Sequence, residues 1–258
     1  MSQRPLVSCL CCTYGRPVFL GESIRCFLDQ DYNNKELIIL NDQEGVHLKV
    51  YPYLPDNIRI YEHPNRFPSL GQKRNYLKSL ARGKYCCIWD DDDLYVPFRI
   101  SESVYFIEQN PDCDILKPKD AFISIGNEKY KVASNRFHAQ AIITKEFIDN
   151  HMYPSISIGE DKVFEDLAKV KYVDIYPSIW SVFRWKIKDV YNVSSVLSSM
   201  EKTSWESVLT YAPYNNIKGD VWVKPEFQHD YWSDLRKVYN DINGFWGEEW
   251  YKKIGRSN

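Results

Sequence analysis

The stretch YCCIWDDDD, residues 85–93, decides how this chain is expected to fold. Its first five residues are apolar and β-prone, which predicts a short buried strand. The aspartates that follow, Asp90 to Asp93, repel one another and suit neither a helix interior nor a strand. They are tolerated on a solvated turn, or where a hard cation neutralises them. Because ligands bind at the carboxyl ends of strands in open α/β sheets, this junction predicts a binding site.

Two other interpretations of the aspartates are an acidic turn in solvent and a calcium loop of the EF-hand type. The solvated turn stays open on these residues alone. The calcium loop requires an oxygen ligand at its fifth position and glycine at its sixth, where this chain has Leu94 and Tyr95. The EF-hand loop is therefore less favoured than the solvated turn.

Apolar runs alternate with helical periodicity along the first 110 residues. We expect strands at residues 6–12, 37–40, 58–61 and 85–89, and helices after Pro17, Ser69 and Pro97. Ser69 and Gln72 have the spacing of a capping box, and we expect Gly83 to end that helix as its C-cap. The order strand, helix, strand, strand, helix, strand, helix predicts an α/β fold with a mostly parallel, doubly wound sheet.

The following residues continue the α/β pattern. Strands are expected within residues 121–144, around a Gly126-Asn127 turn, and again within 172–185. A helix is expected to begin at residues 158–161. Its buried side is assigned to Val163, Phe164, Leu167 and Ala168.

The character of the chain changes after Ser194. Helical stretches interrupted by loops carry five of the eight tryptophans, which we expect to be packing residues rather than sugar-stacking ones. We therefore divide the chain into an α/β domain, residues 1–193, and a mainly helical C-terminal extension, residues 194–258.

Composition narrows the class of protein. With 258 residues, 44% hydrophobic content and a formal net charge of -2, the chain resembles an ordinary globular protein and shows no electrostatic preference for nucleic acid or anionic membranes. Its seven cysteines include two adjacent pairs within predicted strands, where neighbours point to opposite faces. We expect free thiols and a cytoplasmic location, with no transmembrane segment.

The aspartates favour a particular kind of chemistry. The chain has no Gly-x-x-x-x-Gly-Lys-Ser/Thr loop, no Gly-x-Ser-x-Gly elbow and no His-Glu-x-x-His pair. Oxygen ligands select Mg²⁺ or Mn²⁺, which bind through one or two carboxylates and the phosphates of a substrate. Such an ion stabilises a diphosphate as it leaves. The residues therefore favour transfer of a group, most commonly a sugar, away from a nucleotide diphosphate.

Five segments resemble, in order and spacing, the motifs of family-2-type glycosyltransferases with the GT-A fold. They lie at residues 7–16, 37–42, 71–75, 83–93 and 159–161. In order, they are similar to the first strand with its donor loop, the second strand with its terminal aspartate, the Gly-x-x-Arg-Asn helix start, the strand entering Asp-x-Asp, and the Glu-Asp pair of the catalytic base. The resemblance covers roughly residues 5–193.

The resemblance implies a Mn²⁺ or Mg²⁺ ion at the Asp-x-Asp motif. With four consecutive aspartates, the sequence does not determine which two of them form the motif. We favour Asp90 and Asp92, with Asp92 as the direct ligand, and we count Asp93 among the metal candidates. Asp91 or Asp93 would hold ribose or water, and simple solvation of the non-ligating pair stays an alternative.

The resemblance also implies a binding site for the donor nucleotide. Its residues are Thr13, Tyr14, Arg16, Asp42, Arg74, Asp90 and Asp91, with Asp42 contacting the base. On the residues alone, Asp42 is a turn aspartate and Arg74 a surface arginine. Arg74 nevertheless lies near a helix start, against the preference of the helix dipole, which indicates that it serves an anion.

The Glu-Asp pair implies a catalytic base for an inverting reaction. We assign the base to Asp161, while Glu160 would bind the acceptor or exchange roles with it. A carboxylate at a helix N-terminus is stabilised in its ionised form, so it is able to accept a proton. Acidic residues in a first helical turn are also ordinary stabilisers, and that alternative stays open.

One feature departs from the family pattern. Many members have a histidine after the Glu-Asp helix that completes the metal shell, and here Asn192 stands in its place. An amide oxygen ligates such ions more weakly than a charged group does. His229 is the other candidate for this position.

The resemblance therefore implies transfer of a sugar from a nucleotide-diphosphate sugar to an acceptor hydroxyl. A glycan or lipid-linked glycan is the usual acceptor in the family, and a modified nucleobase in DNA is an alternative. A non-catalytic nucleotide-sugar or glycan-binding module, and a retaining reaction, also stay open.

Overall fold

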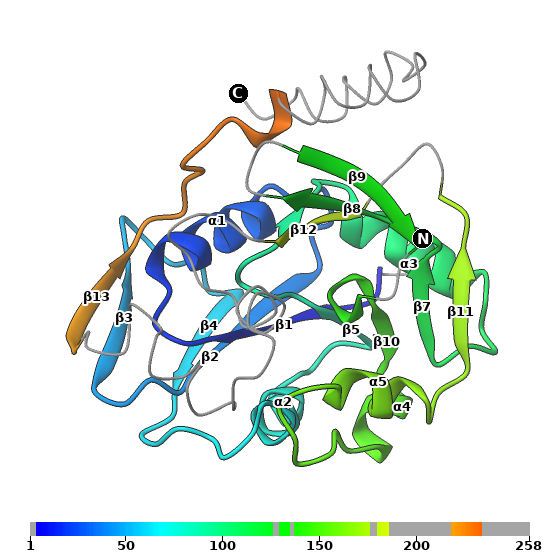
Figure 1. The fold of residues 1–258 in the computed structure, drawn as a ribbon, viewed down its shortest axis with the longest axis horizontal. Helices are drawn as coiled ribbons and strands as arrows, with labels where there is room; N and C mark the ends of the chain where they lie inside the picture. The colour runs from blue at the N-terminus through cyan, green and yellow to red at the C-terminus, as the bar shows by residue number, and fades with distance from the viewer. Residues whose placement is uncertain (1–3, 126–128, 135–136, 176–179, 186–217, 234–258) are drawn as a thin grey trace.

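A seven-stranded sheet forms the centre of the computed structural model, which describes residues 4–125, 129–134, 137–175, 180–185 and 218–233 (Figure 1). The strand order is β11-β7-β10-β5-β1-β2-β4. The strands are β1 (Val7–Thr13), β2 (Lys35–Asn41), β4 (Ile58–Glu62), β5 (Tyr85–Ile88), β7 (Ile115–Pro118), β10 (Ile142–Thr144) and β11 (Val170–Val173). Strand β10 runs antiparallel to both neighbours, and the other pairs are parallel. The expected mostly parallel sheet is confirmed.

Helices cover both faces of this sheet (Figure 1). They are α1 (Pro17–Leu28) and α3 (Arg99–Glu108) on one face, and α2 (Leu70–Ser79), α4 (Lys145–Asn150) and α5 (Glu160–Glu165) on the other. Leu20, Ile24 and Ile100 belong to the first core, and Leu77 and Phe164 to the second. The alternation of side chains along the buried strands thus supplies two hydrophobic cores, as the doubly wound arrangement requires.

Two smaller sheets flank the central one. The first contains β6 (Leu94–Tyr95), β8 (Asp120–Ile125), β9 (Lys129–Ser134) and β12 (Ser181–Trp185) in the order β6-β12-β8-β9. The second pairs β3 (Val46–Val50) with β13 (Gly219–Val223). The strands expected within residues 121–144 and 172–185 are confirmed, and the Gly126-Asn127 turn lies outside the described residues.

The described part of the C-terminal extension packs directly on the α/β domain. Strand β13 runs parallel to β3, and Val221, Val223 and Tyr231 belong to the core beside α1. A Cβ at Gly21 of α1 would lie 2.1 Å from the carbonyl oxygen of Lys224, so the contact is close. The rest of the extension lies outside the described residues, and its division from residues 1–193 stays a prediction.

The start of α2 is confirmed, but its predicted end is wrong. The Ser69 hydroxyl accepts a hydrogen bond from Gln72 N at 3.2 Å, as expected of an N-cap. The helix ends at Ser79 with Leu80 as its C-cap. Gly83 lies beyond it, where a Cβ would stand 2.6 Å from Ser8 N, so glycine permits a close approach to β1.

The predicted buried side of α5 is wrong in two positions. Val163 and Leu167 are 46% and 56% exposed, whereas Phe164 is fully buried. The helix ends at Glu165, so it has too few turns to bury a continuous apolar stripe.

The cysteines agree with the expectation of free thiols. All seven cysteines have free thiols. None of the helices in the described ranges has both the length and the apolar content that crossing a bilayer requires.

Substitution of Gly71 tests how closely α2 packs against the segment that precedes α5. A Cβ at Gly71 would stand 1.8 Å from the carbonyl oxygen of Pro154. We expect Gly71→Ala to lower the free energy of unfolding by about 1–3 kcal/mol, because the backbone of one segment must move. Chemical denaturation measures this change.

Gln72→Ala is the matched control, since Gln72 lies on the same turn with a partly exposed side chain. We expect it to change the free energy of unfolding by about 0.5 kcal/mol or less. Equal stability of Gly71→Ala and the unaltered protein would contradict this packing.

Candidate functional site

Three parallel strands end at one edge of the central sheet and bring the candidate residues together. Thr13 is the last residue of β1, Asn41 is the last of β2, and Asp90 follows β5 closely. These strands are adjacent in the order β5-β1-β2. The donor loop, the end of the second strand and the acidic turn thus lie at one edge of the sheet, where ligands bind in open α/β folds.

Arg16 binds the middle of the acidic turn. Its guanidinium donates through Nε to Asp91 Oδ2 at 3.0 Å, through Nη2 to Asp91 Oδ1, and through Nη1 to Asp92 Oδ2 at 2.9 Å. The Thr13 hydroxyl donates to the same Asp91 carboxylate at 2.6 Å. Asp91 is fully buried, and burial raises its pKa to about 6 against the opposing effect of Arg16. Asp91 therefore anchors the donor loop to the acidic turn.

Arg74 joins the acidic turn to the start of α5. Its guanidinium lies 3.5 Å from Asp90 Oδ1 and donates from Nε to Glu160 Oε1 at 3.2 Å. Burial alone would lower the pKa of Arg74, but the two carboxylates outweigh burial and hold that pKa above its usual range. Burial also raises the pKa of Glu160, an effect that Arg74 partly offsets. Arg74 thus serves anions, as its position near a helix start indicated.

Aromatic rings close the acidic turn at both ends. Trp89 and Tyr95 stack with ring centroids 4.0 Å apart, and the Arg99 guanidinium lies 5.0 Å and 4.5 Å from their centroids. The Tyr95 hydroxyl donates to the carbonyl oxygen of Asp90 at 3.3 Å. Asp93 is only 1% exposed beneath this turn. The rings and the buried Arg99 guanidinium therefore hold the two ends of the turn, in addition to the contacts of its carboxylates.

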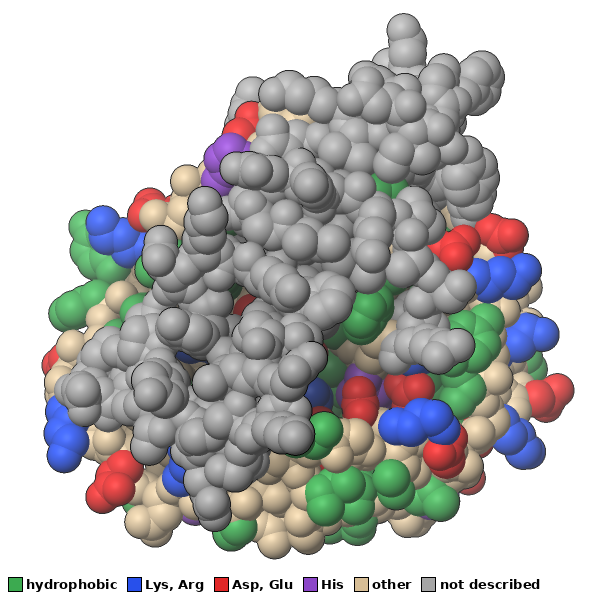
Figure 2. Space-filling model, in the orientation of Figure 1, with side chains coloured by type: hydrophobic (Ala, Val, Ile, Leu, Met, Phe, Trp, Pro, Cys, Tyr) green, Lys and Arg blue, Asp and Glu red, His purple; other side chains and the backbone are tan. Residues whose placement is uncertain are grey.

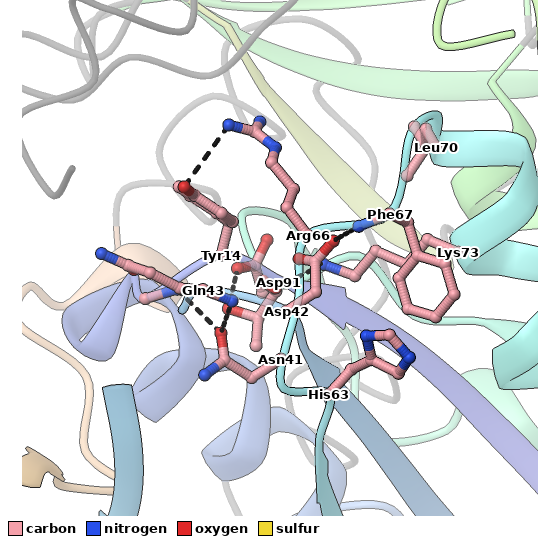
Figure 3. Close-up of polar contacts among 12 residues, drawn as sticks. Tyr14, Asn41, Asp42, Gln43, His63, Arg66, Phe67, Leu70, Lys73 and Asp91 are labelled. Carbon is pink, nitrogen blue, oxygen red and sulfur yellow. Dashed lines mark hydrogen bonds and ion pairs between the residues drawn. The ribbon is translucent and has the colours of Figure 1, made fainter. Parts of the chain in front are cut away.

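Lys73 connects Asp42 to the donor loop (Figure 3). Its ammonium donates to Asp42 Oδ1 and to the carbonyl oxygen of Thr13, the latter at 2.6 Å. Asp42 Oδ2 accepts from Phe67 N at 3.0 Å, and the Asp42 side chain is 5% exposed. Asp42 is thus buried beside the donor loop, while its contact with the base stays a prediction. Sequence reasoning missed Lys73, although the signal that singled out Arg74, a cation near a helix start, applied to it equally.

Tyr14 and Arg66 form a cation–π contact near this edge (Figure 3). The Arg66 guanidinium lies 4.3 Å from the Tyr14 ring centroid, and its Nη1 donates to the Tyr14 hydroxyl at 3.4 Å. Gly15 follows with φ +57°, and a Cβ there would overlap the Gln43 side chain. Asn41 Oδ1 accepts from Gly15 N at 3.3 Å, which fixes the donor loop to the end of β2.

The candidate base differs in environment from its neighbour. Glu160 is 4% exposed and paired with Arg74, whereas Asp161 is partly exposed and its Oδ1 accepts from Lys162 N at 2.7 Å. Gly159 precedes both with φ +73°, which sets the turn into α5. The more accessible carboxylate is therefore that of Asp161.

A buried polar network holds α5 against the sheet. The Lys117 ammonium donates to both oxygens of Glu165 at 3.0 Å, and His138 Nδ1 lies 2.7 Å from Glu165 Oε1. His138 Nε2 lies 2.7 Å from the Tyr153 hydroxyl, and the Tyr153 ring stacks on Phe164 at 3.9 Å. Burial alone would raise the pKa of Glu165, but His138 and Lys117 outweigh it and lower that pKa. Residues of the second core thus position the helix that carries Glu160 and Asp161.

The acidic turn fits an ion that completes its shell with substrate oxygens. Within the described ranges, no group of three or more His, Cys, Asp or Glu side chains is arranged to hold a metal. Asp90 and Asp92 have side chains that are 26% and 18% exposed, and they supply the oxygen ligands that Mg²⁺ and Mn²⁺ prefer. Asn192 lies outside the described residues. His229 packs edge-on against Tyr231 on the described part of the extension.

Comparison with known proteins identifies the family. Residues 8–168 match Glycosyl transferase family 2. An uncharacterized glycosyltransferase of Methanocaldococcus jannaschii is 30% identical over 177 residues, which are 66% of this chain and 59% of that protein. The chain thus spans less than two thirds of this relative's length.

Solved structures of other glycosyltransferases share the fold. S. aureus TarS 1-349 in complex with UDP-GlcNAc aligns with a TM-score of 0.55 and 14% identity, over 69% of this chain and 58% of that one. The mannosyltransferase PcManGT from Pyrobaculum calidifontis, in complex with GDP-Man and Mn²⁺, aligns with a TM-score of 0.51 and 14% identity, over 70% and 57% of the two chains. The arrangement is the GT-A fold that the five motifs implied. Because the family match covers more than half of its residues, the chain belongs to glycosyl transferase family 2.

Proposed function

We propose that this protein transfers a sugar from a nucleotide-diphosphate sugar to an acceptor hydroxyl, with the help of a divalent ion and with inversion at the anomeric carbon. The observation that carries the proposal is Arg74, which links Asp90 of the acidic turn to Glu160 beside the candidate base. Donor-binding and proton-accepting groups are thus held at one site. The two structures in complex with UDP-GlcNAc and with GDP-Man and Mn²⁺ support a nucleotide-sugar donor.

The donor would lie across the carboxyl ends of β5, β1 and β2. Thr13 and Tyr14 would contact the nucleotide from the donor loop, Asp42 would accept a hydrogen bond from the base, and Arg74 would face the phosphates. These groups come from three elements that the hydrogen bonds described above fix to one another. Little reorganisation is then needed when the donor binds.

Asp92, with Asp90, would hold the divalent ion. When bound, Mn²⁺ or Mg²⁺ would stabilise the negative charge of the departing diphosphate. Asp93 is buried, so an ion entering with the donor meets Asp90 and Asp92 first. Asn192 stays a candidate for completing the shell.

Asp161 would accept the proton of the acceptor hydroxyl. The hydroxyl oxygen attacks the anomeric carbon, the bond from that carbon to the diphosphate oxygen breaks, and the proton moves to the Asp161 carboxylate. Glu160 keeps its ion pair with Arg74 and positions the start of α5. A single in-line displacement of this kind inverts the anomeric centre.

The acceptor is proposed as a class rather than as a compound. A glycan or lipid-linked glycan hydroxyl agrees with the family. On the face shown in Figure 2, the described Lys and Arg side chains are interspersed with Asp and Glu, so that part of the surface has no continuous basic area for DNA. Free thiols at every cysteine agree with a cytoplasmic location, which we also propose.

Asp92→Asn tests the metal-assisted step. We expect it to lower Mn²⁺-dependent hydrolysis of the donor by about a hundredfold or more, because the loss of charge stabilisation costs several kcal/mol. Release of nucleoside diphosphate from a panel of UDP- and GDP-sugars, with and without Mn²⁺, measures this. Asp112→Asn, at an exposed carboxylate, is the matched control. Full turnover by Asp92→Asn would refute the assigned role.

Asp161→Asn tests the base. We expect sugar transfer to fall by about 10²- to 10⁴-fold, since a positioned base contributes that much. Thermal stabilisation by the donor should persist, because Asp161 has no proposed donor contact. Asp166→Asn, at an exposed carboxylate that follows the C-terminal end of the same helix, is the control. If Glu160→Gln abolished transfer while Asp161→Asn did not, the two carboxylates would have to exchange roles.

A further inference from the structure

Arg16 is hydrogen-bonded to Asp92, the carboxylate that we propose as the ligand of the divalent ion. Its Nη1 donates to Asp92 Oδ2 at 2.9 Å, while Nε and Nη2 hold Asp91. Nη2 of Arg74 lies 3.5 Å from Asp90 Oδ1. Both partly exposed carboxylates of the acidic turn are thus paired with an arginine.

The position of Arg16 has no other structural explanation among its described contacts. It is the N-cap residue of α1 and its side chain makes no capping hydrogen bond. A cation at a helix N-terminus is unfavourable with respect to the helix dipole. Its three hydrogen bonds to Asp91 and Asp92 outweigh that disadvantage. The Arg16 side chain is therefore placed to bind the acidic turn rather than to stabilise α1.

The two contacts of Arg16 differ in how easily they separate. Asp91 is fully buried and holds the guanidinium at two nitrogens, so this contact is costly to break. The Arg16 and Asp92 side chains are each 18% exposed and share one hydrogen bond. Nη1 is therefore able to leave Asp92 while Arg16 stays anchored on Asp91.

We propose that Arg16 competes with the divalent ion for Asp92, so that the ion binds tightly only together with a nucleoside diphosphate. This inference rests on the proposed function of the same site. The incoming phosphate oxygens accept the N–H that Asp92 loses, because a guanidinium binds phosphate as well as carboxylate. Arg16 thereby passes from the carboxylate to the donor's diphosphate.

Charge balance supports this coupling. A divalent ion entering alone would displace Nη1 of Arg16 from Asp92 and place two positive charges beside that guanidinium, and this local repulsion weakens its binding. An ion that enters with a diphosphate brings its own compensating negative charge. The ion and the nucleotide therefore increase each other's affinity by the same factor, as linkage requires.

The experiment measures Mn²⁺ affinity by electron paramagnetic resonance, without turnover, in the absence and presence of UDP or GDP. For the unaltered protein we expect the nucleotide to tighten Mn²⁺ binding at least tenfold. Arg16→Gln should bind Mn²⁺ without nucleotide at least tenfold more tightly than the unaltered protein, and its gain from nucleotide should shrink. Arg25→Gln, at the partly exposed pair with Asp29 at the end of α1, should behave like the unaltered protein.

Arg16→Lys provides a second variant if Arg16→Gln does not fold. An ammonium lacks the fork that reaches two carboxylates, so Mn²⁺ affinity without nucleotide should also increase. If Mn²⁺ bound equally well with and without nucleotide, or if both Arg16 variants matched the unaltered protein, the competition would be refuted while metal-assisted transfer would stand. If Mn²⁺ bound under neither condition to any variant, the proposed function itself would fail.

Discussion

Mutual repulsion among four consecutive carboxylates is the constraint on which the rest of this site depends. The structure offsets it with cations from different elements: Arg16 from the donor loop pairs with Asp91 and Asp92, and Arg74 from α2 lies against Asp90. Because each cation also contacts another part of the fold, neutralising the turn fixes the donor loop and α5 relative to the sheet edge. The same ion pairs therefore neutralise the aspartates and hold the elements of the site together.

Local sequence signals were sufficient for the elements that carry the site. A continuous apolar run followed by aspartates identified β5 and its turn, and Ser69 with Gln72 identified the start of α2. Since parallel strands end at the same sheet edge, the residues that follow β1, β2 and β5 lie near one another. The hydrogen bond from Thr13 to Asp91 joins two of these strand ends, although the chemical roles of these residues stay predictions.

Features that depend on distant partners were not predictable in this way. Apolar and polar residues alternate along strand β3, and its partner β13 lies far along the chain. Neither segment alone therefore indicates that the two strands pair. Val163 was expected to be buried because periodicity assumes a longer helix than the six residues of α5. Lys73 lies near a helix start and could have been singled out with Arg74, but its partners, the Asp42 carboxylate and the Thr13 carbonyl, are brought near it only by the tertiary fold.

Phosphorus electron–nuclear double resonance on Mn²⁺ bound together with UDP or GDP tests the central claim most directly. If the acidic turn holds the ion against the donor's diphosphate, the spectrum shows strong coupling to phosphorus, because phosphate oxygens ligate the metal. Mn²⁺ bound to the protein–nucleotide complex without any such coupling would contradict the account.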